Sequence, residues 1–199
     1  MHDMRANARS RMTETLLFAS NFLRHPHMLG SIIPSSRFLV NQVLKPIDWQ
    51  RARVIVEYGP GVGSFTGEIL QRMRRDARLV AIETNRDFVK FLRAQLPDER
   101  LHVVQESAAE VQAVLARLGV HKADYIISGI PLGSMPEAVR ADIVAKSRAA
   151  LEPGGAFLVY QFTARVLPAL RRTFGDVRHS FELYNLPPAQ LFVCAAGGS

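Results

Sequence analysis

From residue 52 onward, short apolar runs alternate with helix-like segments, and this alternation is the feature that most restricts the fold. The runs are nearly continuous in apolar residues, which is typical of strands buried on both faces of a parallel sheet. The intervening segments are long enough for the helical crossovers that parallel strands need. We expect strands over residues 52–58, 77–83, 101–105, 123–129 and 155–162, and helices over 64–73, 85–96, 108–118, 136–151 and 164–174.

Both ends of the chain add to this core. Two late apolar runs, over residues 177–183 and 190–196, are separated only by "YNLPPA", which is too short for a helical crossover. We therefore expect them to form an antiparallel hairpin. In front, we expect one helix over residues 10–24 and a second that starts with Ser35 as N-cap and ends at Pro46. The sequence predicts an α/β fold with a mostly parallel seven-stranded sheet, a C-terminal antiparallel hairpin and extra N-terminal helices.

The first predicted strand leads into a glycine-rich loop, "VIVEYGPGVGSFT". Gly59 and Gly61 allow a tight turn with positive φ, and Gly63 opens the next helix, whose free N–H groups favour a negative group nearby. Glu57 lies at the end of the first strand, just before the glycines, and Glu83 ends the second strand. A carboxylate in the position of Glu83 can accept hydrogen bonds from the ribose hydroxyls of an adenosine.

Three kinds of ligand suit such a loop. A phosphate-binding P-loop needs Lys followed by Ser or Thr, but Ser64 and Phe65 follow here. A dinucleotide loop needs G-x-G-x-x-G, whereas this loop reads G-x-G-x-G, and Glu57 would place negative charge beside a pyrophosphate. S-adenosylmethionine (SAM) has no phosphate, and its sulfonium and ammonium groups are cations that favour an acid close by. The loop therefore indicates SAM.

This pattern resembles the first two motifs of the Rossmann-like SAM-dependent methyltransferases, over about residues 52–162. The resemblance implies that the three glycines wrap the methionine part of SAM and that Glu83 holds the ribose. The third motif of these enzymes follows the third strand, where this chain has Ser107 and Ala108, with Glu106 one place early. The resemblance implies that Ser107 and Ala108 contact the adenine.

The fourth predicted strand ends in "SGIPLGSMP", residues 128–136. Relatives that methylate adenine often carry Asn-Pro-Pro-Tyr or Asn-Leu-Pro-Tyr here, and the aromatic ring stacks on the base. Ser128 and the turn after it lack both the Asn and the aromatic residue. A base would lose a stacking partner worth about 1–3 kcal/mol. We therefore expect a target other than a nucleobase.

The stretch "GSIIPSSRFL", with "SGIPLGSMP", "VYQFT" and "NLPPA", resembles the bacterial phospholipid N-methyltransferases over nearly the whole chain. These enzymes are related to the rRNA adenine dimethylases, whose usual extra helical domain would not fit before Ser199. The resemblance implies stepwise methylation of phosphatidylethanolamine towards phosphatidylcholine, with S-adenosylhomocysteine as the other product. Three alternatives stay open: an rRNA adenine N6-methyltransferase, a small-molecule amine methyltransferase, and a non-catalytic SAM-fold module.

An amine must lose a proton before it attacks a methyl group, so a base or a path to water is needed. Tyr160 ends the fifth strand and Tyr184 lies in the hairpin turn, where either ring can face the amine or its methylated cations. Ser128 can accept an amine hydrogen bond and also lies at the cofactor edge. The six histidines have no metal-ligand spacing, so we expect no metal.

Charge and composition bear on partners and location. The net charge of +7 favours an anionic partner, and we expect a membrane surface rather than nucleic acid. The predicted helix over residues 10–24 has an apolar face and nearby arginines, which suits a membrane interface. One cysteine, Cys194, fits a reducing compartment, and no apolar run approaches the roughly 18 residues needed to span a bilayer.

Together these observations predict a cytoplasmic protein that is peripheral at the inner membrane, with a monomer favoured. The front segment, residues 1–46, is expected to contact the membrane and cover the cofactor. Residues 47–199 are expected to form the SAM-binding catalytic domain.

Overall fold

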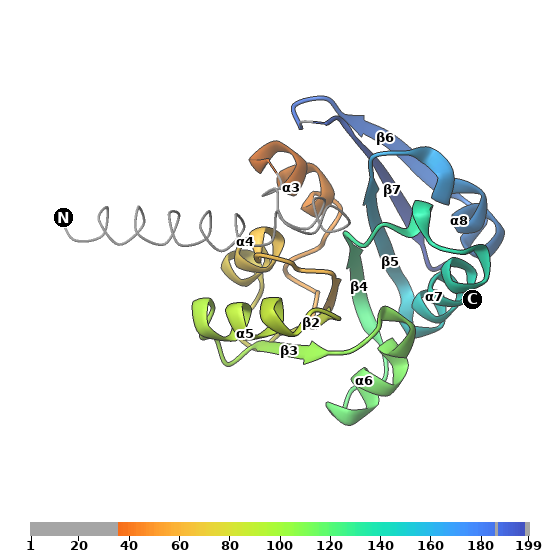
Figure 1. Ribbon diagram of the computed structural model, residues 1–199. Coiled ribbons are helices and arrows are strands. Elements are labelled where there is room, and N and C mark those ends of the chain that lie inside the picture. Colours follow the sequence, from red (N-terminus) through yellow and green to blue (C-terminus); the bar gives the residue numbers. More distant parts are fainter. Residues whose placement is uncertain (1–35, 186, 198–199) are drawn as a thin grey trace.

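The computed structural model of the protein describes residues 36–185 and 187–197, and they build one seven-stranded sheet with helices on both faces (Figure 1). The strand order is β3-β2-β1-β4-β5-β7-β6, in which the first five strands are parallel and β7 is antiparallel to both of its neighbours. The strands are β1 (Val54–Tyr58), β2 (Arg78–Glu83), β3 (Leu101–Gln105), β4 (Ala123–Ser128), β5 (Leu151–Gln161), β6 (Val177–Glu182) and β7 (Ala189–Ala195).

The predicted alternation and the antiparallel hairpin are confirmed, and the fold is that of the Rossmann-like methyltransferases. The α-helices are α3 (Arg37–Leu44), α4 (Ser64–Arg72), α5 (Arg86–Gln95), α6 (Val111–Arg117), α7 (Glu137–Ala150) and α8 (Leu167–Phe174). Helices α3, α4 and α5 lie on one face of the sheet, and α6, α7 and α8 lie on the other (Figure 1). Short 3-10 turns, η2 (Ala108–Glu110) and η4 (Ala164–Val166), lead into α6 and α8.

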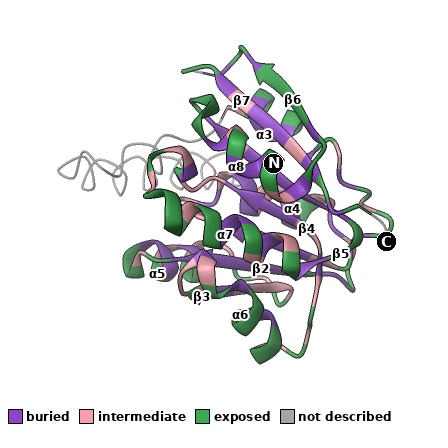
Figure 2. Cartoon of the chain, turned by 90° about the vertical axis from the view of Figure 1, so that its right-hand side faces the viewer, coloured by how far each residue is buried: buried purple, intermediate pink, exposed green. Residues whose placement is uncertain are grey.

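The two faces of the sheet have separate apolar cores because successive strand residues point to opposite sides. In β1, Val56 and Tyr58 face α6, α7 and α8, whereas Ile55 faces α3 and α4. Central strands are buried along their length, while β6 at the edge is largely exposed (Figure 2). The near-continuous apolar runs in the sequence follow from this burial on both faces.

Helix α3 belongs to the predicted front segment, yet it packs into the same core as β1 and β4. Its N-cap is Ser36, one residue after the predicted Ser35, because the Ser36 Oγ accepts the Leu39 N–H at 3.1 Å. The Asn185 side chain in the β6–β7 turn accepts the Ser36 N–H at 3.2 Å. The predicted helix over residues 10–24 lies outside the described residues.

Strand order reverses between β1 and β4, and this reversal positions the site. Strand β2 lies on one side of β1 in the sheet, and β3 lies beyond β2. The connection after β3 then leads to β4, which lies on the other side of β1. The loops that follow the two central strands therefore separate and leave a crevice at their carboxyl ends. This edge is called the carboxyl edge below. Because β6 runs parallel to β5, the turn after β6 lies at the same edge.

Candidate functional site

A cleft of about 230 Å³ opens at the carboxyl edge, between the loops that follow the first four strands. Its walls combine the glycine loop with the carboxylates of Glu83 and Glu106 and a set of apolar side chains. An apolar cleft with a few polar groups at one end suits an adenosine. The lining residues are Gly59, Ile82, Glu83, Thr84, Glu106, Ser107, Ala108, Gly129, Ile130, Pro131, Met135, Val139 and Ile143.

The glycine loop has the conformation that the sequence predicts. Gly59, Gly61 and Gly63 have φ angles of 68°, 54° and 85°, in the left-handed region that favours glycine. A Cβ on Gly59 would lie 2.7 Å from Cγ2 of Ile130, so only glycine lets the loops after β1 and β4 approach this closely. The backbone therefore forms the floor of the cleft and admits close contact with a ligand.

Glu83 ends β2 and is almost fully buried at the cleft, with 7% of its surface exposed. One carboxylate oxygen accepts the Gly61 N–H at 3.3 Å, and the other accepts the Asn85 N–H at 2.9 Å. The Thr84 hydroxyl also donates to this second oxygen, at the long distance of 3.5 Å. An ionised carboxylate has about four acceptor sites, so capacity remains for a ribose hydroxyl. The position agrees with the predicted ribose contact.

Glu57 lies beneath the glycine loop and is not among the described residues that line the cleft. Thr66 Oγ1 donates a hydrogen bond to its carboxylate at 2.7 Å. Burial raises the pKa of Glu57 to about 7; the Thr66 hydrogen bond opposes this shift, and the charge of Glu83 adds to it. A cation above the loop would favour the ionised form, so Glu57 is suited to act on SAM through space rather than by contact.

The loop after β3 supplies the opposite wall of the cleft. Ser107 caps η2 by accepting the Ala109 N–H at 3.2 Å, and this capped turn brings Ser107 and Ala108 to the cleft beside Glu106. The Glu106 N–H donates to the Glu83 carbonyl at 3.1 Å and ties this wall to the end of β2. The predicted adenine contacts thus share one cleft with the predicted ribose contact.

Ser128 and the residues after it have different surroundings. The Ser128 side chain is fully buried, and its Oγ has no hydrogen-bond partner in the described part of the chain. It is in register with Tyr58, whose ring belongs to the core under α6, α7 and α8. The cleft is lined instead by the next two residues, Gly129 and Ile130, and the Gly129 N–H donates to the Tyr58 carbonyl at 3.1 Å.

Tyr160 arches over Gly129. A Cβ on Gly129 would lie 2.2 Å from the Tyr160 hydroxyl oxygen and 2.7 Å from Cζ, so the phenol occupies the space that a side chain would need there. The ring is half-buried and stacks on Phe65 of α4, with centroids 4.8 Å apart and planes 16° apart. This packing holds the hydroxyl beside the cleft-lining turn.

Gln161 is a residue of this site that the sequence reasoning missed. Its Nε2 donates to the Ile130 and Tyr160 carbonyls, both at 2.8 Å, and its Oε1 accepts the Gly133 N–H at 3.1 Å. The amide therefore clamps the turn after β4 to the end of β5. The sequence shows only a polar amide at the end of an apolar strand; that it is buried, and which groups it pairs with, depends on the tertiary structure.

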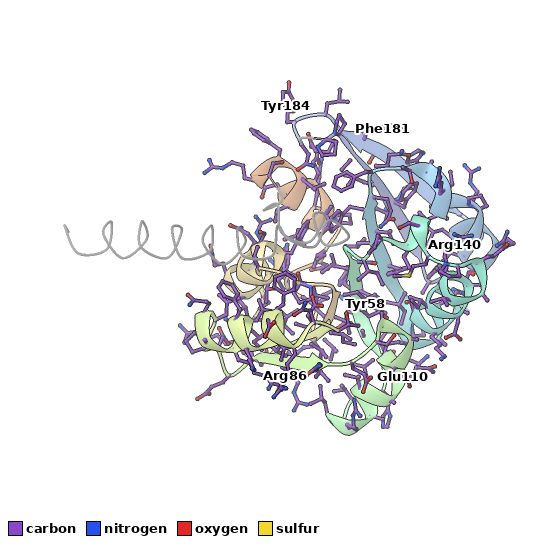
Figure 3. All side chains as sticks on the ribbon, viewed as in Figure 1. Tyr58, Arg86, Glu110, Arg140, Phe181 and Tyr184 are labelled. Carbon is purple, nitrogen blue, oxygen red and sulfur yellow. The ribbon has the colours of Figure 1, made fainter. Side chains whose placement is uncertain are left out.

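Tyr184 lies in the β6–β7 turn and is 78% exposed. Its ring packs against Phe38, with centroids 5.4 Å apart. Figure 3 shows Tyr184 at the far end of the hairpin, and it is not among the described residues that line the cleft. The structure thus brings Tyr160 to the cleft-lining turn and leaves Tyr184 at the periphery.

Two further findings concern metal ions and the membrane. Within residues 36–185 and 187–197, no group of three or more His, Cys, Asp and Glu side chains could hold a metal ion. No helix in this same range is long and apolar enough to cross a bilayer.

The cleft residues fit SAM on chemical grounds. Positive-φ glycines, a carboxylate with spare acceptor sites and an apolar slot correspond to its amino-acid, ribose and adenine parts. Comparison with known proteins agrees. The family described as "Ribosomal RNA adenine dimethylase" matches residues 18–149.

Two curated relatives extend this result. The ornithine lipid N-methyltransferase of Singulisphaera acidiphila is 32% identical over 185 residues, which cover 92% of this chain and 96% of that enzyme. The ribosomal RNA small subunit methyltransferase A of Mycoplasma mycoides is 32% identical over 97 residues, but these cover only 47% of this chain and 34% of that enzyme.

Among solved structures, the N-methyltransferase NodS of Bradyrhizobium japonicum in complex with S-adenosylhomocysteine has a TM-score of 0.62 at 12% identity. The match covers 80% of this chain and 86% of that one, and at this identity it shows the shared fold. The family match and the full-length relative also show the protein family and the class of enzyme. The chain therefore belongs to the ribosomal RNA adenine dimethylase family and is a SAM-dependent N-methyltransferase.

Proposed function

We propose that this enzyme methylates the amino headgroup of a membrane lipid, phosphatidylethanolamine, towards phosphatidylcholine, while it is peripheral at the inner membrane surface. The observation that carries the proposal is the extent of the likeness. The ornithine lipid enzyme matches over 96% of its length, whereas the rRNA enzyme of Mycoplasma mycoides matches over 34%. A lipid amine is therefore favoured over an rRNA base.

The geometry beside the cleft supports a small amine rather than a flat base. The turn after β4 lacks the Asn and the aromatic residue that base-methylating relatives often carry there, and the Tyr160 phenol fills the space above Gly129. Leu132 in this turn is fully buried in the core and presents no surface to a base. A base would have neither an amide to hold its amine nor a ring at that position on which to stack.

In this proposal the residues of the chain bind and orient, since methyl transfer depends mainly on alignment. Bound SAM supplies the activated methyl group. Glu83 holds the ribose, Glu57 favours the cationic end, and Tyr160 faces the amine with its hydroxyl while its ring stabilises the methylated cations. Gln161 keeps the turn after β4 in place, and the Ile130 carbonyl is already used by that clamp.

The predicted contacts of Ser128 and Tyr184 with the amine stay predictions. The buried Ser128 hydroxyl would need the turn to shift before it could accept from an amine. Tyr184 would need the lipid headgroup, or the hairpin turn itself, to approach the cleft.

Ornithine lipid is the second candidate substrate, and the full-length relative is the observation that favours it. Ornithine and ethanolamine both present an amine that can be methylated more than once. They differ in that only the ethanolamine lipid carries a phosphate beside the amine. The two substrates are separated by direct assay.

The test is transfer of labelled methyl from SAM to vesicles that contain either phosphatidylethanolamine or ornithine lipid, with ribosomal RNA as a parallel substrate. Label in phosphatidylethanolamine is the expected result, and chromatography of the lipid extract counts the methyl groups added. Label only in ornithine lipid would replace the substrate but keep the lipid class. Label only in RNA, or only in a soluble amine, would overturn the proposal.

A further inference from the structure

Six large apolar side chains are exposed in the described part of the chain, and all six lie at the carboxyl edge of the sheet. Phe38 lies in the first turn of α3, Val139 lies in the first turn of α7, and Phe162 follows β5. The other three are the most exposed of the six: Phe181, near the end of β6, at 61%, and Leu183 and Tyr184, in the turn that follows, at 72% and 78%.

Exposed apolar residues scattered singly are normal, but these share one edge with the cleft. Phe38 contacts Tyr184 across the gap between α3 and the turn. Phe181 and Leu183 lie next to this pair at the same end of the hairpin, and the four residues Phe38, Phe181, Leu183 and Tyr184 are called here the apolar tip. Figure 3 shows Phe181 and Tyr184 projecting at the end of the hairpin.

The apolar tip has a defined conformation because the polar groups behind it are paired. The buried Glu182 side chain accepts the Tyr184 N–H at 2.8 Å. The Asn185 side chain donates to the Pro187 carbonyl at 2.7 Å and accepts the Ser36 N–H at 3.2 Å. These bonds turn the polar atoms inward and leave the rings and Leu183 facing outward.

The composition of the apolar tip fits a bilayer interface. Phe, Tyr and Leu side chains gain free energy when their apolar parts leave water, and the Tyr hydroxyl can stay at the headgroup level. Arg37 is exposed beside Phe38, and the chain carries a net charge of +7, both of which suit an anionic surface. The cleft opens on the same edge, so a bilayer in contact with the apolar tip would face the cleft.

We propose that the apolar tip inserts into the lipid interface and holds the cleft towards the headgroups. The proposal rests on the proposed function for the identity of the surface, because an amine fixed to a lipid must be reached where it lies. Val139 lines the cleft, and Phe162 follows β5 at the same edge of the sheet.

The first experiment measures co-sedimentation of the full-length protein with vesicles of phosphatidylethanolamine and phosphatidylglycerol. Leu183→Asp should weaken vesicle binding by about tenfold or more, because a charge replaces an exposed apolar side chain at the interface. His121→Asp makes a comparable change in charge on an exposed residue before β4, at the opposite edge of the sheet, and should bind nearly as wild type. Equal binding by the two variants would overturn the proposal.

A second measurement reports insertion directly. Leu183→Trp should bind at least as well as wild type, and its added fluorescence should be quenched by lipids brominated near the headgroup. Fluorescence that is unquenched on bound protein would overturn the proposal. Loss of self-association in Leu183→Asp, with vesicle binding unchanged, would assign the apolar tip to a second copy of the chain instead.

Activity on detergent-dispersed lipid and activity on vesicles together distinguish the role of the apolar tip from the proposed enzymatic function. Leu183→Asp should methylate lipid dispersed in detergent at the wild-type rate and lose activity only on vesicles. If the wild-type protein binds vesicles through Leu183 but methylates no lipid, the docking surface stands and the proposed function falls. If lipid is methylated and Leu183→Asp matches wild type on vesicles, the proposed function stands and the docking surface falls.

Discussion

Two carboxylates at the glycine loop differ in surroundings and therefore in chemistry. Glu83 faces the cleft and accepts backbone N–H groups from two loops, whereas Glu57 is enclosed beneath the loop with one hydroxyl donor. The first is suited to hydrogen-bond a ligand. The second is a buried acid whose charge is costly until a cation arrives.

Replacing Glu83 by Ala should weaken SAM binding by about 100-fold or more. If Glu83 holds the ribose as proposed, the change removes a charge-assisted hydrogen bond worth about 1.5–3 kcal/mol, and it also leaves the Gly61 N–H without its acceptor. Isothermal titration calorimetry measures the affinity. Asp87→Asn, an exposed acid in the first turn of α5, is the matched control and should bind SAM as wild type does. Unchanged affinity in Glu83→Ala would refute the site.

Glu57 should make stability depend on pH. Its folded pKa of about 7 lies above the ordinary glutamate value of 4.5, so the folded state holds the proton more tightly than the unfolded state does. The stabilisation of the folded state that comes from this tighter proton binding is fully present below about pH 4.5 and is lost as pH rises through about 7. Glu57→Gln removes the cost of the buried charge, so it should be more stable than wild type at pH 8 by up to roughly 3 kcal/mol.

The difference in free energy of unfolding between Glu57→Gln and wild type should shrink as pH falls towards 5, because wild-type Glu57 is then protonated in the folded state. The Gln carbonyl can still accept from Thr66, so the hydrogen bond is kept. Urea unfolding at pH 5 and pH 8 measures both values. The same difference at both pH values would contradict the assigned ionisation.

At the level of elements, α4 begins at a glycine because the glycine loop must turn sharply into it. Gly63 caps the helix with φ of 85°, and a Cβ there would lie 2.8 Å from Leu92 of α5. Gly67 lies within the same helix and has open space around it. One helix therefore contains a glycine that the fold requires and one that it does not.

Substituting each glycine by Ala should change stability in opposite directions. Gly63→Ala should lower the free energy of unfolding by about 1–3 kcal/mol through backbone strain and the contact with Leu92. Gly67→Ala should raise it by roughly 0.5–1 kcal/mol, since Ala stabilises a helix interior relative to Gly. Chemical denaturation of the two variants measures both free energies of unfolding. Destabilisation by Gly67→Ala as large as by Gly63→Ala would contradict the account.

At the level of the whole molecule, the parallel strands gather the chemistry at one edge. The cleft, Tyr160 and the apolar tip all lie where the parallel strands end. The net charge of +7 adds a long-range attraction to anionic surfaces that short-range apolar contacts do not supply. Vesicle binding should therefore have one component that salt screens and one that it does not.

Raising NaCl from about 0.1 M to about 1 M shortens the Debye length from about 10 Å to about 3 Å. Wild-type binding to phosphatidylglycerol vesicles should fall but persist, and the part that persists should be absent in Leu183→Asp. Co-sedimentation at both salt concentrations measures this. Complete loss of wild-type binding at high salt would show that charge alone holds the protein on the membrane.

The strands, helices and glycine loop were predictable from local sequence, because strand burial and helix packing leave periodic apolar patterns. The positive φ angles at Gly59 and Gly61 followed from the loop sequence in the same way. The start of α3 was predicted one residue early, since adjacent serines are equally good caps and only the local geometry at Ser36 distinguishes them.

What local sequence determined, then, is the succession of elements and the ligand class of the first loop. The tertiary structure alone decided that β7 lies between β5 and β6, that Gln161 clamps the turn after β4, and that Tyr160 fills the space above Gly129. It also decided that Ser128 faces the core and Tyr184 the solvent. These outcomes depend on which strands pair and which face each side chain takes, and such long-range contacts leave no periodic trace in the chain.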